Sequence, residues 1–122
     1  MPKKLLLLLA ICYTLVLAVL SLVTISTLPE IGTDYDDKIF HVFAHGILFS
    51  LWYFTLNSYK IIRPTFIAVL FSVIYGIIIE VLQGLLTIAR YFDTLDVLAN
   101  CIGVVIATLF IIIRNRTIVK NL

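Results

Sequence analysis

The sequence predicts an all-α integral membrane protein, in which residues 1–122 form a single domain with a bundle of four transmembrane helices. Its composition is 62% hydrophobic and only 13% charged, with a mean hydropathy of +1.16, whereas a soluble domain is about half apolar. A soluble chain this short could not bury so much apolar surface in one core. The apolar residues also gather into four runs, each near the length of about 20 residues that spans a bilayer.

Residues that typically end helices separate the four runs, which cover residues 5–28, 39–56, 65–86 and 94–113. The first run is longer than the apolar part of a signal peptide, which has about 7–15 residues, so we expect a retained helix. Pro29 and Gly32 indicate a loop after the first helix. Pro64 suits the first turn of the third helix.

The distribution of charge predicts how these helices are oriented. Lysine and arginine lie mostly in residues 3–4, 60–63 and 114–120, whereas the other two connectors, residues 29–37 and 87–93, hold most of the acidic residues. Positively charged loops stay on the cytoplasmic side of a membrane. We therefore expect both termini in the cytoplasm and both acidic connectors outside. The net charge of +2 is too small to indicate a nucleic-acid surface.

Polar residues recur at helical spacing on three of the four predicted helices, so each set lies on one helical face. These sets are Asp37, His41 and His45 with Lys38 beside them on the second helix, Glu80 and Gln83 on the third, and Asp96 and Asn100 on the fourth. Gly76 and Gly84 flank Glu80 and allow a neighbouring helix to approach. Arg90 and Asp93 lie in the connector between the third and fourth helices.

Glu80 is the most informative of these residues, because it lies within a span. At about 1.5 Å per residue it is about 22 Å from the cytoplasmic start of its helix, in the outer third of a hydrocarbon core about 30 Å thick. An ionisable group there costs about 2.5–3.5 kcal/mol and should face the bundle beside a partner. Arg90, His41 and Lys38 are the expected partners. The second and fourth helices bring their polar groups to the same depth.

The polar groups are candidates for a site at the outer face. We predict catalytic roles for Glu80, His41 and Asp96, as general acids or bases acting on a lipid-linked substrate. We predict binding roles for Asp37, Lys38, Gln83, Arg90, Asp93 and Asn100. The alternative for the carboxylates is interhelical hydrogen bonding that fixes the bundle. For Arg90, the alternative to holding a phosphate or carboxylate is capping of the third helix.

Metal binding is a further alternative for the histidines. His41 and His45 are four residues apart and could ligate one ion together with Glu80 or Asp96. Two histidines with unanchored carboxylates are weak evidence for a metal site. We therefore expect a structural hydrogen bond from His41 to a carboxylate, no metal and no cofactor.

Three motifs taken together resemble the VanZ-like family, which is named for a bacterial membrane protein linked to low-level teicoplanin resistance. The motifs are Asp37-Lys38-x-x-His41, Tyr75-Gly76-x-x-x-Glu80-x-x-Gln83, and Arg90-x-x-Asp93-x-x-Asp96-x-x-x-Asn100-x-x-Gly103. The resemblance covers most of the chain and implies a multi-pass protein of the bacterial cytoplasmic membrane. His45 departs from it, since an aromatic residue is expected there, and residues 87–89 lack an expected proline.

The resemblance implies a protein that binds or modifies a cell-envelope component and contributes to glycopeptide resistance. Its ligand would be a lipid-linked glycan, a lipid headgroup or a peptidoglycan peptide, with membrane lipids as its other partners. The alternative is a non-catalytic accessory protein or a small ion or proton carrier. A carrier needs a polar route through the whole membrane, and the cytoplasmic halves of the last three helices hold no ionisable residue. No nucleophile or nucleotide motif assigns a reaction.

Overall fold

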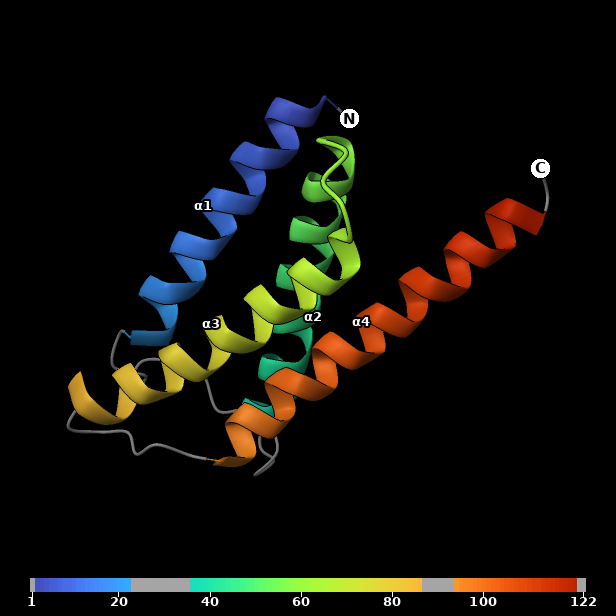
Figure 1. Cartoon of the computed structure of the whole chain (residues 1–122). Coiled ribbons are helices and arrows are strands. Elements are labelled where there is room, and N and C mark those ends of the chain that lie inside the picture. Colours follow the sequence, from blue (N-terminus) through green and yellow to red (C-terminus); the bar gives the residue numbers. More distant parts are fainter. Residues whose placement is uncertain (1, 23–35, 87–93, 121–122) are drawn as a thin grey trace.

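The computed structural model describes residues 2–22, 36–86 and 94–120 as four long helices (Figure 1). The helices are α1 (Lys3–Leu22), α2 (Asp36–Ser58), α3 (Pro64–Leu86) and α4 (Thr94–Lys120). All four are long and apolar enough to cross a membrane. The predicted all-helical membrane architecture is confirmed for this part of the chain.

The helix boundaries differ from the predicted spans mainly where polar residues continue a helix. The second helix was predicted to begin at residue 39, but α2 begins at Asp36, so the polar start of the first motif, Asp37-Lys38, is helical. The fourth span was predicted to end at residue 113, but α4 continues to Lys120 and has 27 residues. At about 1.5 Å per residue it is about 40 Å long, longer than the hydrocarbon core. The predicted end of the first span, residues 23–28, lies outside the described residues.

The other three helices pack around α2, which contacts each of them. Helices α1 and α4 do not touch within the described ranges. Helices α2, α3 and α4 are in mutual contact, as predicted. Consecutive helices run in opposite directions, so α2 and α4 run parallel and share the most extensive contact in the bundle (Figure 1). The N-terminal ends of α2 and α4 therefore lie at the same end of the bundle.

A glycine sets the distance between α2 and α4. A Cβ atom on Gly103 would lie 2.1 Å from the carbonyl oxygen of Val42, which no real side chain could tolerate. On the facing helix, a Cβ atom on Gly46 would lie 3.3 Å from the carbonyl oxygen of Gly103. Small residues allow helix backbones to approach in membranes. Gly103 therefore serves packing within the chain.

Helix α1 has the fewest buried residues, and only Ala10 is fully buried. Its large side chains mostly face outward, as expected for a helix in lipid. Hydrogen bonds nevertheless attach it to the bundle, because the hydroxyl of Tyr13 donates to the carbonyl of Ala44 at 2.6 Å and that of Tyr75 donates to the carbonyl of Thr14 at 2.6 Å. The most lipid-exposed helix thus also contributes polar contacts to the core.

Candidate functional site

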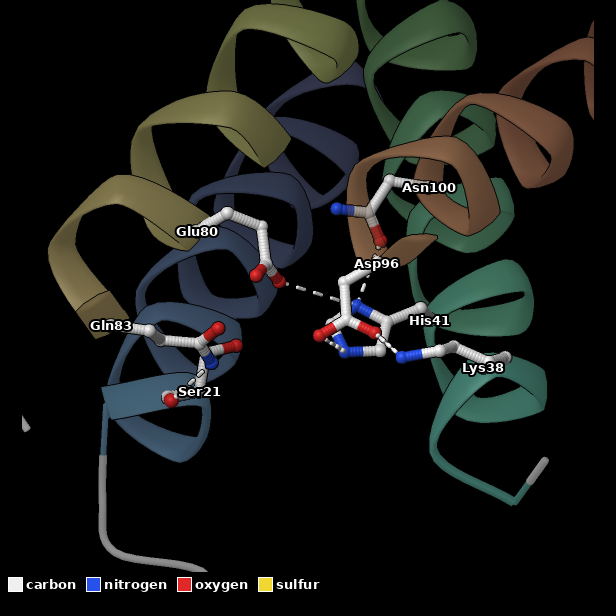
Figure 2. Close-up of polar contacts among 7 residues, drawn as sticks. All are labelled: Ser21, Lys38, His41, Glu80, Gln83, Asp96 and Asn100. Atoms are coloured by element: carbon white, nitrogen blue, oxygen red, sulfur yellow. Dashed lines mark hydrogen bonds and ion pairs between the residues drawn. The ribbon is translucent and has the colours of Figure 1, made fainter. Parts of the chain in front are cut away.

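A buried polar cluster lies at the end of the bundle where α2 and α4 begin (Figure 2). Glu80 of α3 is 0% exposed, and Asp96 and Asn100 of α4 are 3% and 2% exposed. The side chain of His41, from α2, is 10% exposed and lies between them. Figure 2 shows the side chains of Glu80, Asp96 and Asn100 gathered around that of His41. We call these four residues the polar cluster.

His41 contacts every other member of the polar cluster. Its Nδ1 atom lies 2.8 Å from Oδ1 of Asn100 and 3.9 Å from Oε1 of Glu80. Its Nε2 atom lies 3.8 Å from Oδ2 of Asp96. Because an amide oxygen only accepts hydrogen bonds, Nδ1 carries the proton in the bond to Asn100. In neutral His41 the lone pair is therefore on Nε2, on the side of Asp96.

Lys38 adds a positive charge at the edge of the polar cluster. Its Nζ atom pairs with Oδ1 of Asp96. The Lys38 side chain is 25% exposed, whereas that of Asp96 is 4% exposed. Such an arrangement suits a lysine whose apolar stem lies along the bundle while its amine stays near water. The cluster and Lys38 together hold two carboxylates, one ammonium group and one imidazole.

Gly76 allows α3 to approach the polar cluster, as expected from its position one turn before Glu80. A Cβ atom there would lie 3.0 Å from Nδ2 of Asn100 and 3.3 Å from Cε1 of His45. His45 is 2% exposed, and its ring stacks on that of His41 with centroids 6.2 Å apart. Within the described residues, its Nδ1 atom has no hydrogen-bond partner. His45 thus lies one turn deeper than the cluster, where it packs against His41 and Gly76.

Gln83, for which a binding role was predicted, contacts the first helix. Its Nε2 atom donates a hydrogen bond of 2.5 Å to the carbonyl oxygen of Ser21 on α1, as Figure 2 shows. Gln83 is 1% exposed, so this bond joins α1 to α3 beside the cluster. No feature of the sequence predicts this bond, because a backbone carbonyl is an acceptor in any residue.

Three other predicted site residues are not placed. Arg90 and Asp93 lie outside the described residues. Asp37 is in the first turn of α2, but its side chain is also outside the described part of the chain. Their predicted binding roles remain predictions.

His41, Glu80 and Asp96 are suitably placed to share a metal ion. One potential ligand atom from each residue lies within 4.8 Å of the other two. His45 is not part of this group in the described chain. The alternative in which His41 and His45 ligate one ion together is therefore not favoured. His45 is directed deeper into the bundle, beside Gly76.

Two apolar hollows lie between α2 and α4 beside the polar cluster. One, of about 480 Å³, begins at Lys38 and includes Leu95 and Ile102. The other, of about 760 Å³, continues toward the far end of both helices and reaches Phe54 and Arg114. Both are lined by Val42 and Phe43 and so adjoin. We call them together the α2–α4 groove.

The chain matches the VanZ/LLP1 family over residues 5–115. The protein belongs to this family. The match covers all of α2 and α3 and most of α1 and α4, and it includes the three motifs that bring the polar cluster together. Comparison with curated proteins and with solved structures gives no match. This VanZ-family chain is therefore a multi-pass membrane protein whose role has to be argued from its own site.

Proposed function

We propose that this VanZ-family protein binds or modifies a lipid-linked component of the bacterial cell envelope at the outer side of the cytoplasmic membrane. The observation that carries the proposal is the meeting of Glu80, His41 and Asp96, from three different helices, in one buried cluster. The proposal takes both termini as cytoplasmic, on the basic segments of the sequence. The end of the bundle that holds the cluster then faces outward.

The cost of burying carboxylates favours a functional role for the cluster. A charged group within a span costs about 2.5–3.5 kcal/mol, and such groups commonly mark substrate or ion pathways. In our proposal Glu80 accepts a proton from the bound headgroup, while His41 and Asp96 orient it. Proton transfer needs an acid or base within hydrogen-bond reach of the reacting group, and His41 already links both carboxylates.

The α2–α4 groove supports a ligand that carries a lipid chain. Its lining is apolar, and it starts at Lys38, which pairs with Asp96 of the cluster. From Lys38 to Phe54 it follows 16 residues of α2, which is about 24 Å at 1.5 Å per residue. A headgroup at the cluster would thus leave its chain along the groove. This arrangement also fits glycopeptide resistance, if the bound component is a precursor of the cell wall.

An accessory role without catalysis is the competing function. It is favoured by the contacts that join helices through polar groups, such as Lys38 to Asp96 and Gln83 to Ser21. An ion or proton carrier is less well supported. Among the described residues of the opposite half of α2, α3 and α4, the buried polar groups are hydroxyls such as those of Thr55 and Ser72.

Two substitutions of Glu80 separate the proposed function from the accessory role. Glu80→Gln keeps the size and much of the hydrogen bonding, so it should abolish the protein's effect on teicoplanin susceptibility while membrane expression stays normal. If Glu80 only joins helices, Glu80→Gln should be nearly silent and Glu80→Leu should lower expression, because its polar neighbours lose their partner. The control is Thr108→Val, which removes a hydroxyl group from α4 away from the cluster.

Unchanged teicoplanin susceptibility in Glu80→Gln would contradict the hypothesis that Glu80 is catalytic and would leave the accessory role. Binding can be followed separately by native mass spectrometry of the purified protein with lipid-linked wall precursors. We expect Phe43→Trp, which narrows the α2–α4 groove without touching the cluster, to weaken this binding.

A further inference from the structure

The polar cluster combines the three features of a metal site: suitable donor atoms, short distances between them, and an oriented imidazole. The donors are one imidazole and two carboxylates, which suit Zn²⁺ and similar divalent ions. One ligand atom from each residue lies within 4.8 Å of the others. We propose that His41, Glu80 and Asp96 bind one divalent transition-metal ion. The inference rests on the proposed function and deepens it, because it concerns the same site and gives Glu80 the role of a metal ligand in place of that of a free base.

The orientation of His41 is the observation that separates this cluster from a chance group of acidic residues. Metal-binding histidines usually donate their second ring N–H to an oxygen acceptor, which fixes the ring and its tautomer. Asn100 has this position, with its Oδ1 atom 2.8 Å from Nδ1 of His41. The ring therefore presents the lone pair of Nε2 toward Oδ2 of Asp96, 3.8 Å away. Asn100 is the positioning residue of the site.

The distances between donors allow an ion after a modest contraction. Two ligands of a tetrahedral Zn²⁺ are separated by about 3.3 Å when each bond is about 2.0 Å. The 3.8 Å between His41 Nε2 and Asp96 Oδ2 is longer than a hydrogen bond and close to this separation. Oε1 of Glu80 lies 3.9 Å from Nδ1 of His41, the protonated nitrogen, so the side chain of Glu80 must rotate about its own bonds to reach an ion held by Nε2.

The charges of the cluster also favour a cation. Glu80 and Asp96 are both buried, and Lys38 pairs with Asp96. Figure 2 shows Glu80 and Lys38 on opposite sides of the cluster, so an ion between the carboxylates would not displace the lysine stem. The ammonium group of Lys38 is partly exposed and can turn toward water when Asp96 binds the ion.

A metal ion would determine which headgroups the site accepts. Without it, two carboxylates would repel a phosphate or carboxylate group. Three protein ligands leave a fourth position on Zn²⁺ open, which suits an anionic oxygen of the ligand. The inferred ligand class is therefore a lipid whose headgroup carries a phosphate or carboxylate.

Metal content gives a test that does not depend on the envelope ligand. The full chain, purified in detergent with its affinity tag removed, is equilibrated with Zn²⁺, desalted and analysed by elemental mass spectrometry. We expect about one Zn²⁺ per chain for the wild type, and a loss of tenfold or more in affinity for Asp96→Asn and His41→Gln. Asn100→Ala should keep the stoichiometry with weaker binding, about 10–100-fold, as for other residues that orient a ligand.

The matched control is His45→Tyr, which removes the neighbouring histidine and should leave Zn²⁺ binding unchanged. Co²⁺ in place of Zn²⁺ gives visible absorption bands that report a histidine and carboxylate environment. Wild-type protein without bound metal, or binding that survives His41→Gln and falls with His45→Tyr, would overturn the proposal. Metal binding with a silent Glu80→Gln phenotype would instead contradict the proposed function alone.

Discussion

His41 is the residue on which the polar cluster depends most, because it contacts polar groups of both α3 and α4. A histidine can be neutral or charged near neutral pH, so it suits either a proton or a metal ion between two carboxylates. Asn100 fixes its ring, and Gly76 makes room beside Asn100. The chemistry of the site thus depends on residues that have no charge.

The pair of Lys38 and Asp96 should be energetically coupled. Removing one partner leaves the other charged group buried, which costs about 1–3 kcal/mol or more for a charge. We expect Lys38→Met to destabilise the protein by about this amount, and Lys38→Met with Asp96→Asn to cost less than the sum of the two single changes. Thermal unfolding in detergent measures all three variants. Additive effects would show that the two groups are not coupled.

The residues of the cluster were predictable from spacing and depth alone. His41, Glu80, Asp96 and Asn100 were expected to reach one depth, and the structure brings them together. The bond from Gln83 to Ser21 was not predictable, because it depends on how α1 and α3 are rotated against each other, and this rotation does not follow from the sequence. The place of His45 one turn deeper follows from its spacing of four residues from His41.

Among the elements, α2 differs most from what its sequence suggests. Apart from the polar stripe of Asp37, His41 and His45 it is largely apolar, so periodicity does not tell which of its other faces meets each neighbouring helix. In the structure its aromatic residues contact three neighbouring helices. Tyr53 is buried and accepts a hydrogen bond from Asn115 of α4, and Trp52 donates to Thr14 of α1 and packs against the ring of Phe71 of α3. Hydropathy alone would place such residues at the membrane interface.

The contact between α2 and α4 should be sensitive to one methyl group. Gly103→Ala would put its Cβ atom against the carbonyl of Val42, so the two helices must separate. We expect a loss of about 1–3 kcal/mol, typical of an overpacked core, together with weaker lipid binding in the adjoining groove. The control is Gly84→Ala, because Gly84 is exposed on α3 and alanine favours a helix by up to about 1 kcal/mol.

This comparison is made by thermal unfolding of both variants in the same detergent. If Gly103→Ala were as stable as the wild type, α2 and α4 would not approach as closely as the structure has them. A change in Gly84→Ala of the same size and sign would point to a general effect of glycine replacement.

For the whole molecule, length and hydropathy were enough to predict four spans, because each span must satisfy its backbone hydrogen bonds within itself. They did not predict that α4 continues as a helix to Lys120. A basic segment adds little to hydropathy, although its arginines and lysine are good helix formers next to an existing helix. The order of packing around α2 was also beyond the sequence, since all four runs are apolar enough to cross a membrane.

The orientation of the molecule can be tested with single cysteines. Cys12 and Cys101 are free and are first replaced by alanine. We then expect Thr33→Cys to react with an impermeant thiol reagent in intact cells, and Thr117→Cys to react only after the membrane is permeabilised, because basic segments stay in the cytoplasm. The opposite pattern would place the polar cluster on the cytoplasmic side and contradict an envelope ligand.

The order of the helices along the chain has a consequence for biosynthesis. Glu80 belongs to α3, whereas Asp96 and Asn100 belong to α4. Helix α4 is synthesised after α3 and leaves the ribosome later. While α3 is already in the membrane, the nascent chain holds an acidic residue whose neighbours from α4 have not been translated. We expect α3 to stay beside the translocon until α4 arrives, and chains that stop before Thr94 to be removed by membrane proteases. The stable insertion of α3 would thus depend on the synthesis of α4.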